Sequence, residues 1–474
     1  MTRINIQNRY TYFMLKTNTV SHTPAGSKYK HGNLQMKPEI KSKSCLRPAP
    51  STKNLDMSGR NFFMLYCTSS LLSAIVGVVI IMTLLISATS ATAQKAIVGD
   101  TIYTMEGDPI VNGVVLIRDG KIERVGSVAE ITIPADYEKF QGSVVTPGLI
   151  DARSVVGLAG YYNQDHDQDQ LEYSHALQPD LRAIDAYNSR EELVGFLLKN
   201  GITTVHTGHA PGAVISGQTM IVKTTGRTVD EALVDSTTAL AITLGSVVRS
   251  NFDTPGTRSK GVSMLRQELI RAVEYAEKRS NADPERRPER DLRLEALADM
   301  LDGRLFALIT AQRSQDIMTA LRLQQEFGFP LIIDGAAEAY LLLDEIADAG
   351  VPVIIHPTMV RTRGDTENAA FDTSQKLSEA GIPFAFQSSY ETYVPKTRIA
   401  LFEAAVAVGY GLDRMTALRA LTIETASLFG LDNRIGSLQN GKEADIVIFN
   451  GDPFEYTSRP THVFINGRLL HEAN

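Results

Sequence analysis

The sequence predicts an α/β fold in which a parallel sheet or barrel is flanked by β-rich segments at the two ends of the chain. In the middle of the chain, short apolar runs alternate with helical patterns, which is typical of βαβ units. A β-branched run over residues 144–150 contains Pro147 and Gly148 and is followed by Asp151. This pattern is typical of a buried strand whose end faces a site.

Five further strands are predicted from apolar runs that end in a polar or small residue, as the active-site strands of a barrel do. They cover residues 202–206, 305–309, 330–333, 351–356 and 382–386. One helix has readable ends, because Ser189 and Glu192 form a capping-box pattern and Gly201 follows the last apolar position. Residues 278–291, which are charged and Pro-rich, predict an exposed loop between two helices.

Both ends of the chain carry short β-branched runs. Near the start, Asp119-Gly120 stands between two apolar runs, which is a strong hairpin signal. Near the end, similar runs lie at residues 446–449 and 463–465. The two ends therefore predict β structure outside the central α/β region.

Composition excludes one class of partner. The chain has 474 residues, of which 43% are hydrophobic and 21% charged, and its net charge is -7. Residues 1–60 carry +9, so residues 95–474 must carry -16 to give that total. An acidic body of this kind argues against nucleic-acid binding.

The N-terminal segment, residues 1–94, indicates export. No residue is charged over 61–94, the core at 71–86 is apolar, and an A-x-A-like site follows at Ala91 to Ala93. An uncleaved membrane tether through residues 65–88 is the alternative interpretation. We therefore expect an exported protein, either periplasmic or membrane-anchored. Both cysteines, Cys45 and Cys67, precede the predicted cleavage site, so the mature chain would have no disulfide.

Several motifs resemble the amidohydrolase superfamily, in its imidazolonepropionase-like branch. They are the Pro-Gly-Leu-Ile-Asp run at 147–151, Gln-Pro-Asp at 178–180, Gly-Ile-Thr-Thr-Val-His at 201–206 and the Gly-Gln segment at 215–223. The resemblance implies a (β/α)8 TIM-type barrel over 147–435 and a small composite β-sandwich built from 95–146 and 436–474. It also implies hydrolysis of non-peptide C–N bonds in small linear or cyclic amides.

The chain departs from that superfamily at the metal site. Members hold zinc or another divalent metal with histidines and an aspartate after the barrel strands. The matching positions here are Arg153, Val155, Thr310, Gly335 or its neighbour Asp334, and Ser389. Zinc needs three or four imidazole, thiolate or carboxylate donors, and an arginine beside it would repel it. We therefore predict no metal cofactor, and catalysis by the usual route is in doubt.

Other residues are candidates for chemistry or binding. His206, His209 and His356 follow predicted strands and are weak catalytic candidates, although a lone histidine is more often structural. Matching to the family indicates five ligand-binding candidates, Arg153, Gln218, Lys223, Arg313 and Glu338. His166 and His175 lie in an acidic loop that would bind a cation weakly, and a solvated surface is the alternative.

Three functional hypotheses remain open. The chain is a divergent hydrolase with a rebuilt site, a non-catalytic subunit in a homo- or hetero-oligomer with an intact amidohydrolase, or a binding protein for a small anion held by Arg153. Each involves a small-molecule ligand. The sequence does not identify the substrate.

Overall fold

The computed structural model describes residues 94–281, 283–355, 363–390 and 399–473. These residues belong to one compact unit, residues 85–474. The predicted export signal at 71–93 and the candidate His356 lie outside the described residues. In the part of the chain that is described, no helix is long and apolar enough to cross a membrane.

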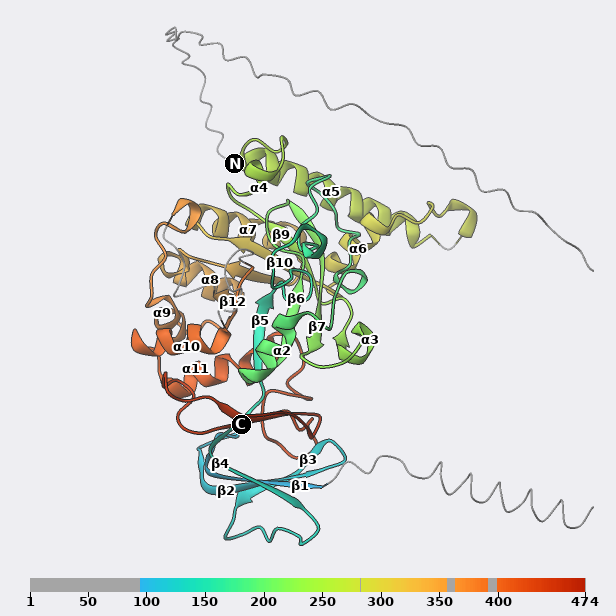
Figure 1. The fold of residues 1–474 in the computed structure, drawn as a ribbon. Helices are drawn as coiled ribbons and strands as arrows, with labels where there is room; N and C mark the ends of the chain where they lie inside the picture. The colour runs from blue at the N-terminus through green and yellow to red at the C-terminus, as the bar shows by residue number, and fades with distance from the viewer. Residues whose placement is uncertain (1–93, 282, 356–362, 391–398, 474) are drawn as a thin grey trace, which may run out of the picture. The chain divides into compact units, whose positions relative to one another are not determined.

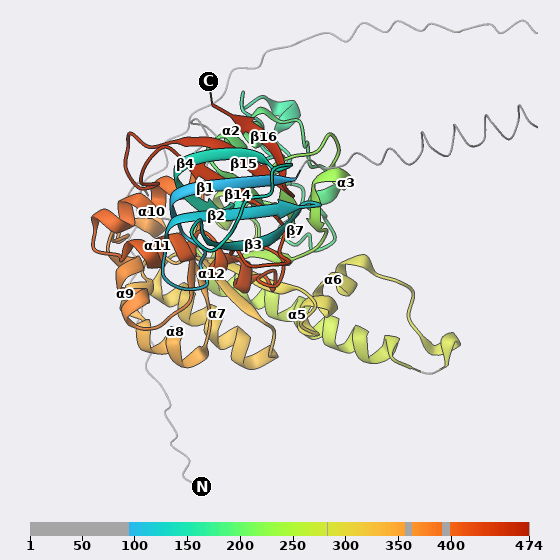
Figure 2. The same cartoon turned by 90° about the horizontal axis from the view of Figure 1, so that it is seen from below.

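One sheet is built from both ends of the chain, as Figure 2 shows. Its strand order is β16-β15-β14-β4-β1-β2-β3. The strands are β1 (Lys95–Ile102), β2 (Ile110–Arg118), β3 (Lys121–Ser127), β4 (Glu138–Pro147), β14 (Ile446–Phe449), β15 (Pro460–Ile465) and β16 (Arg468–Glu472). The two halves join where β14 pairs antiparallel with β4, for example Ile448 with Val145. The predicted joining of the two chain ends is confirmed.

The predicted hairpin turn lies between β2 and β3. Asp119 and Gly120 both have positive φ, 52° and 78°, as a type I′ turn requires. Alternation along the strands then sends apolar side chains to both faces of the sheet. Ile97, Val115 and Ile448 belong to one buried cluster, whereas Ala96 and Val114 belong to another that includes Tyr137.

Within the described residues, eight strands form the wall of the barrel (Figure 1). They are β5 (Leu149–Ser154), β6 (Ile202–Gly208), β7 (Ile215–Lys223), β9 (Ala239–Thr243), β10 (Phe306–Ala311), β11 (Leu331–Gly335), β12 (Val353–Ile355) and β13 (Phe384–Phe386). A bridge between Ser154 and Ser389 brings the last strand back to the first. A short strand, β8 (Leu233–Asp235), pairs with β7 outside this wall. The predicted barrel class is confirmed, and each of the five strand candidates overlaps an observed strand.

One barrel strand runs against the others. β7 pairs antiparallel with both β6 and β9, with Lys223 opposite Thr204 and Thr219 opposite Gly208. The chain therefore makes a hairpin from β6 to β7 without a crossover helix. As a result, β7 ends with Lys223 at the end of the barrel where β6 begins. Apolar periodicity does not encode strand direction, so the sequence did not predict this reversal.

Helices surround the strands in Figure 1. They are α2 (Glu192–Lys199), α3 (Val229–Ala232), α4 (Val248–Asn251), α5 (Arg258–Arg279), α6 (Leu292–Leu301), α7 (Ser314–Phe327), α8 (Leu343–Ala349), α9 (Thr373–Glu379), α10 (Ala400–Gly409), α11 (Arg414–Ala420) and α12 (Ile423–Leu428). The predicted loop at 278–291 joins α5 to α6 and includes one short 3-10 turn, Pro284–Arg286.

The start of α2 differs from the prediction. The capping box at Ser189 and Glu192 is wrong, because the N-cap is Glu191, whose carboxylate accepts a hydrogen bond from the Leu193 amide at 2.7 Å. The predicted end is confirmed: Gly201 follows the cap residue Asn200 and has a φ of 84°. Only glycine adopts such a backbone without strain.

Candidate functional site

Arg153 lies at the end of β5 and is fully buried. Its Nη2 donates a hydrogen bond to the carbonyl oxygen of His209. Its Nε and Nη1 are buried without a hydrogen-bond partner, and none of the described carboxylates pairs with it within 4.0 Å. Each unsatisfied buried donor costs about 1–3 kcal/mol. The burial lowers the pKa of Arg153, against the opposing effect of Asp334 and Asp151 nearby.

Asp334, at the end of β11, is the carboxyl group with the strongest electrostatic effect on Arg153. One of its oxygens accepts from the Thr310 hydroxyl at 2.5 Å, and the other accepts from the Gln387 side-chain amide at 2.6 Å. Burial raises the pKa of Asp334. Both oxygens are therefore already engaged by protein donors.

Asp151 lies two residues before Arg153 and is also fully buried. Its Oδ1 accepts from the backbone amides of Arg153 at 3.2 Å and Ser388 at 3.0 Å, while Oδ2 has no hydrogen-bond partner. Burial raises the pKa of Asp151 to about 7, against the effect of these hydrogen bonds.

Three of the positions matched to metal ligands carry no donor suited to a metal. Val155 is buried in an apolar cluster with Ala159 and Ala210. Gly335 has a φ of 86°, and a Cβ there would lie 2.3 Å from the Gln312 side chain. Ser389 has a φ of 81°, and its hydroxyl is buried without a partner. A strained serine with an unsatisfied hydroxyl is a feature that functional sites often contain.

The two histidines of β6 and its following loop differ completely. His206 is fully satisfied: its Nδ1 is 2.8 Å from the Ala152 carbonyl and its Nε2 is 2.7 Å from the Thr219 hydroxyl. Because a carbonyl can only accept, Nδ1 carries the proton. Burial lowers the pKa of His206 to about 3. His206 is thus a neutral structural residue, and the structure does not support its candidacy as a catalytic group.

His209 is also buried, with 5% of its surface exposed, but neither ring nitrogen has a hydrogen-bond partner. The Gln170 carbonyl oxygen lies near the ring and favours its charged form, yet that oxygen already accepts from the Ala210 amide at 2.7 Å. Burial and the charge of Arg153 lower the pKa of His209 to about 4. The ring is therefore neutral at pH 7.

Neither Gln218 nor Lys223 has a hydrogen bond or ion pair with Arg153 among the described residues. The Gln218 amide donates to the Pro179 carbonyl at 2.9 Å and so fixes the loop beside β7. Lys223 pairs with Asp445 and, at 2.9 Å, with Glu443, both in the C-terminal segment. Since β7 is reversed, Lys223 stands at the opposite end of the barrel from Arg153. Its expected ligand-binding role is therefore corrected to a buried ion-pair role.

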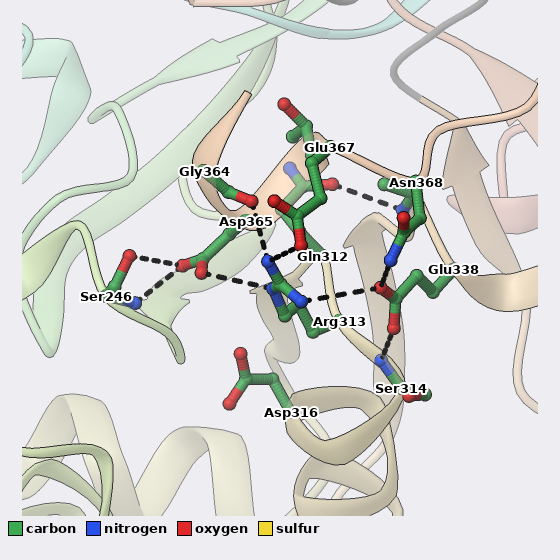
Figure 3. Close-up of polar contacts among 12 residues, drawn as sticks. Ser246, Gln312, Arg313, Ser314, Asp316, Glu338, Gly364, Asp365, Glu367 and Asn368 are labelled. Atoms are coloured by element: carbon green, nitrogen blue, oxygen red, sulfur yellow. Dashed lines mark hydrogen bonds and ion pairs between the residues drawn. The ribbon is translucent and has the colours of Figure 1, made fainter. Parts of the chain in front are cut away.

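Arg313 and Glu338 do meet, in the network that Figure 3 shows. Arg313 donates to Glu367 at 2.6 Å and to the Gly364 carbonyl at 2.8 Å. Glu338 accepts from the Ser314 amide at the start of α7 and from Asn368, each at 2.7 Å. The sequence did not indicate Asp365, which bonds Ser246 and Arg258 in the same network. Protein groups satisfy this network throughout.

The donor set at the barrel centre does not fit the metal of the superfamily. Asp334 and His206 have their donor atoms engaged, and the Arg153 guanidinium is a permanent cation among them. Within the described residues, no group of three His, Cys, Asp or Glu is placed to hold a metal ion. Gln387, which the sequence reasoning missed, directly follows β13, the place where a barrel strand presents functional residues.

Known proteins share both the fold and the sequence pattern. The amidohydrolase family matches residues 392–470. The solved amidohydrolase from Thermotoga maritima MSB8 is 28% identical, with a TM-score of 0.75, over 80% of this chain and all of that one. Amidohydrolase tasK of Hapsidospora irregularis is 23% identical over 75% of this chain and 39% of its own length. The imidazolonepropionase of Symbiobacterium thermophilum is 30% identical over 121 residues, which are 25% of this chain and 26% of that protein.

The chain therefore covers less than half of the length of each of these two relatives. The barrel, the composite sheet and these matches are features that this chain shares with amidohydrolases. The predicted resemblance of this chain to the amidohydrolase superfamily, in its imidazolonepropionase-like branch, is confirmed.

Proposed function

We propose that this chain is a small-molecule binding protein with an amidohydrolase fold, in which an internal charge cluster stands where the superfamily holds its metal. The observation that carries the proposal is the buried Arg153 guanidinium beside Asp334 and Asp151. A cation built into the chain lies near these carboxyl groups, where a relative would hold a divalent metal. Unlike a metal, it cannot polarise a water molecule into hydroxide.

The remaining groups at the centre also support binding over hydrolysis. A general base must reach its substrate, but Asp334 and His206 are fully buried, and each of their side-chain oxygen and nitrogen atoms already has a protein hydrogen-bond partner. The unsatisfied atoms include donors, the Nε and Nη1 of Arg153, and acceptors, the Oδ2 of Asp151 and the Oε1 of Gln387. Such a mixed set suits water or a neutral polar group better than a lone anion.

One observation favours a second candidate, a hydrolase with a rebuilt site. The pKa of Asp151, about 7, matches what a general base needs at neutral pH, and its Oδ2 is free to accept a proton. The imidazolonepropionase name among the relatives is consistent with C–N bond hydrolysis. In this case Asp151 would activate water without a metal.

The test measures metal content and hydrolysis on the same purified full chain. We expect well under one equivalent of zinc, manganese or iron, and no turnover of linear or cyclic amides. Metal-free turnover that is lost in Asp151→Asn would establish the second candidate. One tightly bound metal per chain, with turnover that depends on it, would overturn the binding proposal.

We also propose that the protein is exported, on the basis of the uncharged segment at 61–94. N-terminal sequencing of the fractionated protein should begin near Gln94 if the segment is cleaved. A retained segment in the membrane fraction would indicate a tether, and recovery from the cytoplasm would contradict export. A stable complex with an intact amidohydrolase, seen on co-purification, would support the partner-subunit alternative.

A further inference from the structure

A hollow lies beside the barrel centre, and His209, whose carbonyl oxygen contacts Arg153, is part of its lining. It is lined by residues of the connection between β5 and α2 and by His209, which follows β6. The polar lining consists chiefly of Asp169, Glu172, Asp180, Arg182, Asp185 and His209. The carbonyl oxygen of His209 accepts from Arg153, so this residue contacts the centre through its backbone and also lines the hollow.

The His209 ring is held in place although its nitrogens bind nothing. Its Cδ2 packs so closely on Gly217 that a Cβ there would come within 2.4 Å of it. Gly217 has a φ of 138°, a conformation that side chains rarely adopt. The neutral imidazole therefore has one unsatisfied acceptor and one unsatisfied donor, in a residue that lines the hollow. A buried polar group without a partner is costly unless a ligand or water satisfies it.

The carboxylates around the hollow are only weakly neutralised. The side chain of Asp169 has no ion pair among the described residues. The closest described cations are 4.0 Å from Asp180, on Arg293, and 3.9 Å from Asp185, on Arg182. The hollow therefore has four carboxylates in its lining and a single guanidinium, and its net charge is negative. Converging charges of one sign concentrate ligands of the opposite sign.

The spacing of these groups selects the kind of cation. No three His, Cys, Asp or Glu residues in the described part of the chain are close enough to share one metal ion. A metal needs its oxygen and nitrogen donors at about 2.0–2.6 Å. An organic cation is larger, and carboxylates that stand apart can still surround it.

We propose that this hollow binds a small organic cation that carries a primary ammonium or guanidinium group. The four carboxylates surround its charge, and the unprotonated ring nitrogen of His209 accepts a hydrogen bond from an N–H of the ligand. The inference names the ligand class for the binding function proposed above and rests on that function. It places the ligand on the side of the barrel to which β5 and β6 deliver their C-terminal ends, where barrels of this class bind small molecules.

The test is calorimetric titration of the full chain with three probes of one carbon skeleton, butylammonium, butyrate and butanamide. We expect butylammonium to bind at least tenfold more tightly than the other two, with an affinity that falls as salt is raised. The double variant Asp180→Asn/Asp185→Asn should lose at least tenfold in affinity. The control, Asp165→Asn, removes an exposed carboxylate of the same connection that does not line the hollow, and should stay within twofold.

A second variant separates the histidine from the carboxylates. His209→Leu should weaken butylammonium binding while the probe selectivity remains, and its melting temperature shows whether it is folded. Equal binding of butyrate, or an unchanged affinity in the double variant, would overturn the inference. Metal content is measured on the same sample so that the two proposals can be tested separately. A bound catalytic metal would contradict only the proposed binding function. A lack of selectivity for the cationic probe would contradict only the proposed ligand class.

Discussion

The two ends of the barrel differ in how their buried cationic side chains, Lys223 and Arg153, are paired. At the end where β6 begins, Lys223 contacts Glu443 at 2.9 Å and also Asp445, and Glu443 pairs in turn with Arg434. At the other end, Arg153 has one hydrogen bond, to a carbonyl oxygen, and two unsatisfied nitrogens. The first arrangement links β7 to the C-terminal segment, whereas the second leaves polar atoms without partners.

This difference separates stability from function within one barrel. In barrels of this class the C-terminal ends of the strands carry the site, and the opposite ends serve stability. The ion pairs of Lys223 fit the stabilising role, because each charge has an opposite charge in contact. Unsatisfied groups such as the Nη1 of Arg153 and the Oδ2 of Asp151 reduce stability, and proteins retain such groups mainly at functional sites.

The largest expected effect is at the satisfied end. Lys223→Met leaves Glu443 and Asp445 without their shared cation, and removing one partner of a buried ion pair costs about 3–5 kcal/mol. Denaturant unfolding should show this loss. Arg227→Met is the matched control, since Arg227 forms only an exposed pair with Glu231, and its midpoint should not move. A Lys223→Met protein as stable as the parent would remove the contrast between the two ends.

An intermediate effect should appear in the pH dependence of Asp151→Asn. A carboxyl group whose pKa rises from 3.8 to about 7 on folding binds its proton more tightly when folded, so its contribution to stability declines as pH rises from about 4 to 7. Asparagine resembles the protonated form at every pH. The free energy of unfolding of the variant should equal that of the parent near pH 4.5. At pH 8 it should be higher than that of the parent by about 1–4 kcal/mol.

The histidines act in the opposite direction. The pKa values of His206 and His209 are lowered, to about 3 and about 4, so their contribution to stability is lost as pH falls below 6.5. The parent and the Asp151→Asn variant contain the same histidines, so this contribution is equal in both. The difference between their stabilities at each pH therefore reports on Asp151 alone. A difference that does not vary between pH 4.5 and 8 would show that Asp151 is ionised throughout.

The smallest effect is expected from Arg153→Met. The substitution removes a poorly partnered buried cation, and the raised pKa values of Asp334 and Asp151 allow both carboxyl groups to become neutral. The free energy of unfolding should therefore change by no more than about 1 kcal/mol at pH 6. A loss comparable to that of Lys223→Met would mean that Arg153 is as well paired as Lys223, and the two ends would no longer differ.

The sequence predicted the barrel because strand ends, helix ends and turn residues are local features. The motif at 147–151 also predicted that Arg153 lies near the end of a strand, and Arg153 is the next-to-last residue of β5. It did not predict the partners of His206, because Thr219 is 13 residues away and reaches the ring only through the β6–β7 hairpin. His206 and His209 look alike in sequence, and burial and hydrogen bonding alone distinguish them.

Two further differences arose from short or reversed strands. β9 has five residues, Ala239–Thr243, all buried, and such a run cannot be separated by periodicity from part of a helix. Lys223 was expected near the ligand because it matches a ligand-binding position of the family. The reversal of β7 sends it to the other edge.

The sheet that joins the chain ends also sets an order of events during synthesis. β4 is made about 300 residues before β14, its antiparallel neighbour, yet the sheet is incomplete until both are present. The first four strands therefore leave the ribosome with an edge that only the last part of the chain can cover. An unpaired edge of this kind attracts other strands. Residues 95–147 would thus be the segment that most needs a holdase chaperone until translation ends. A stop codon late in the gene would leave the same edge exposed permanently.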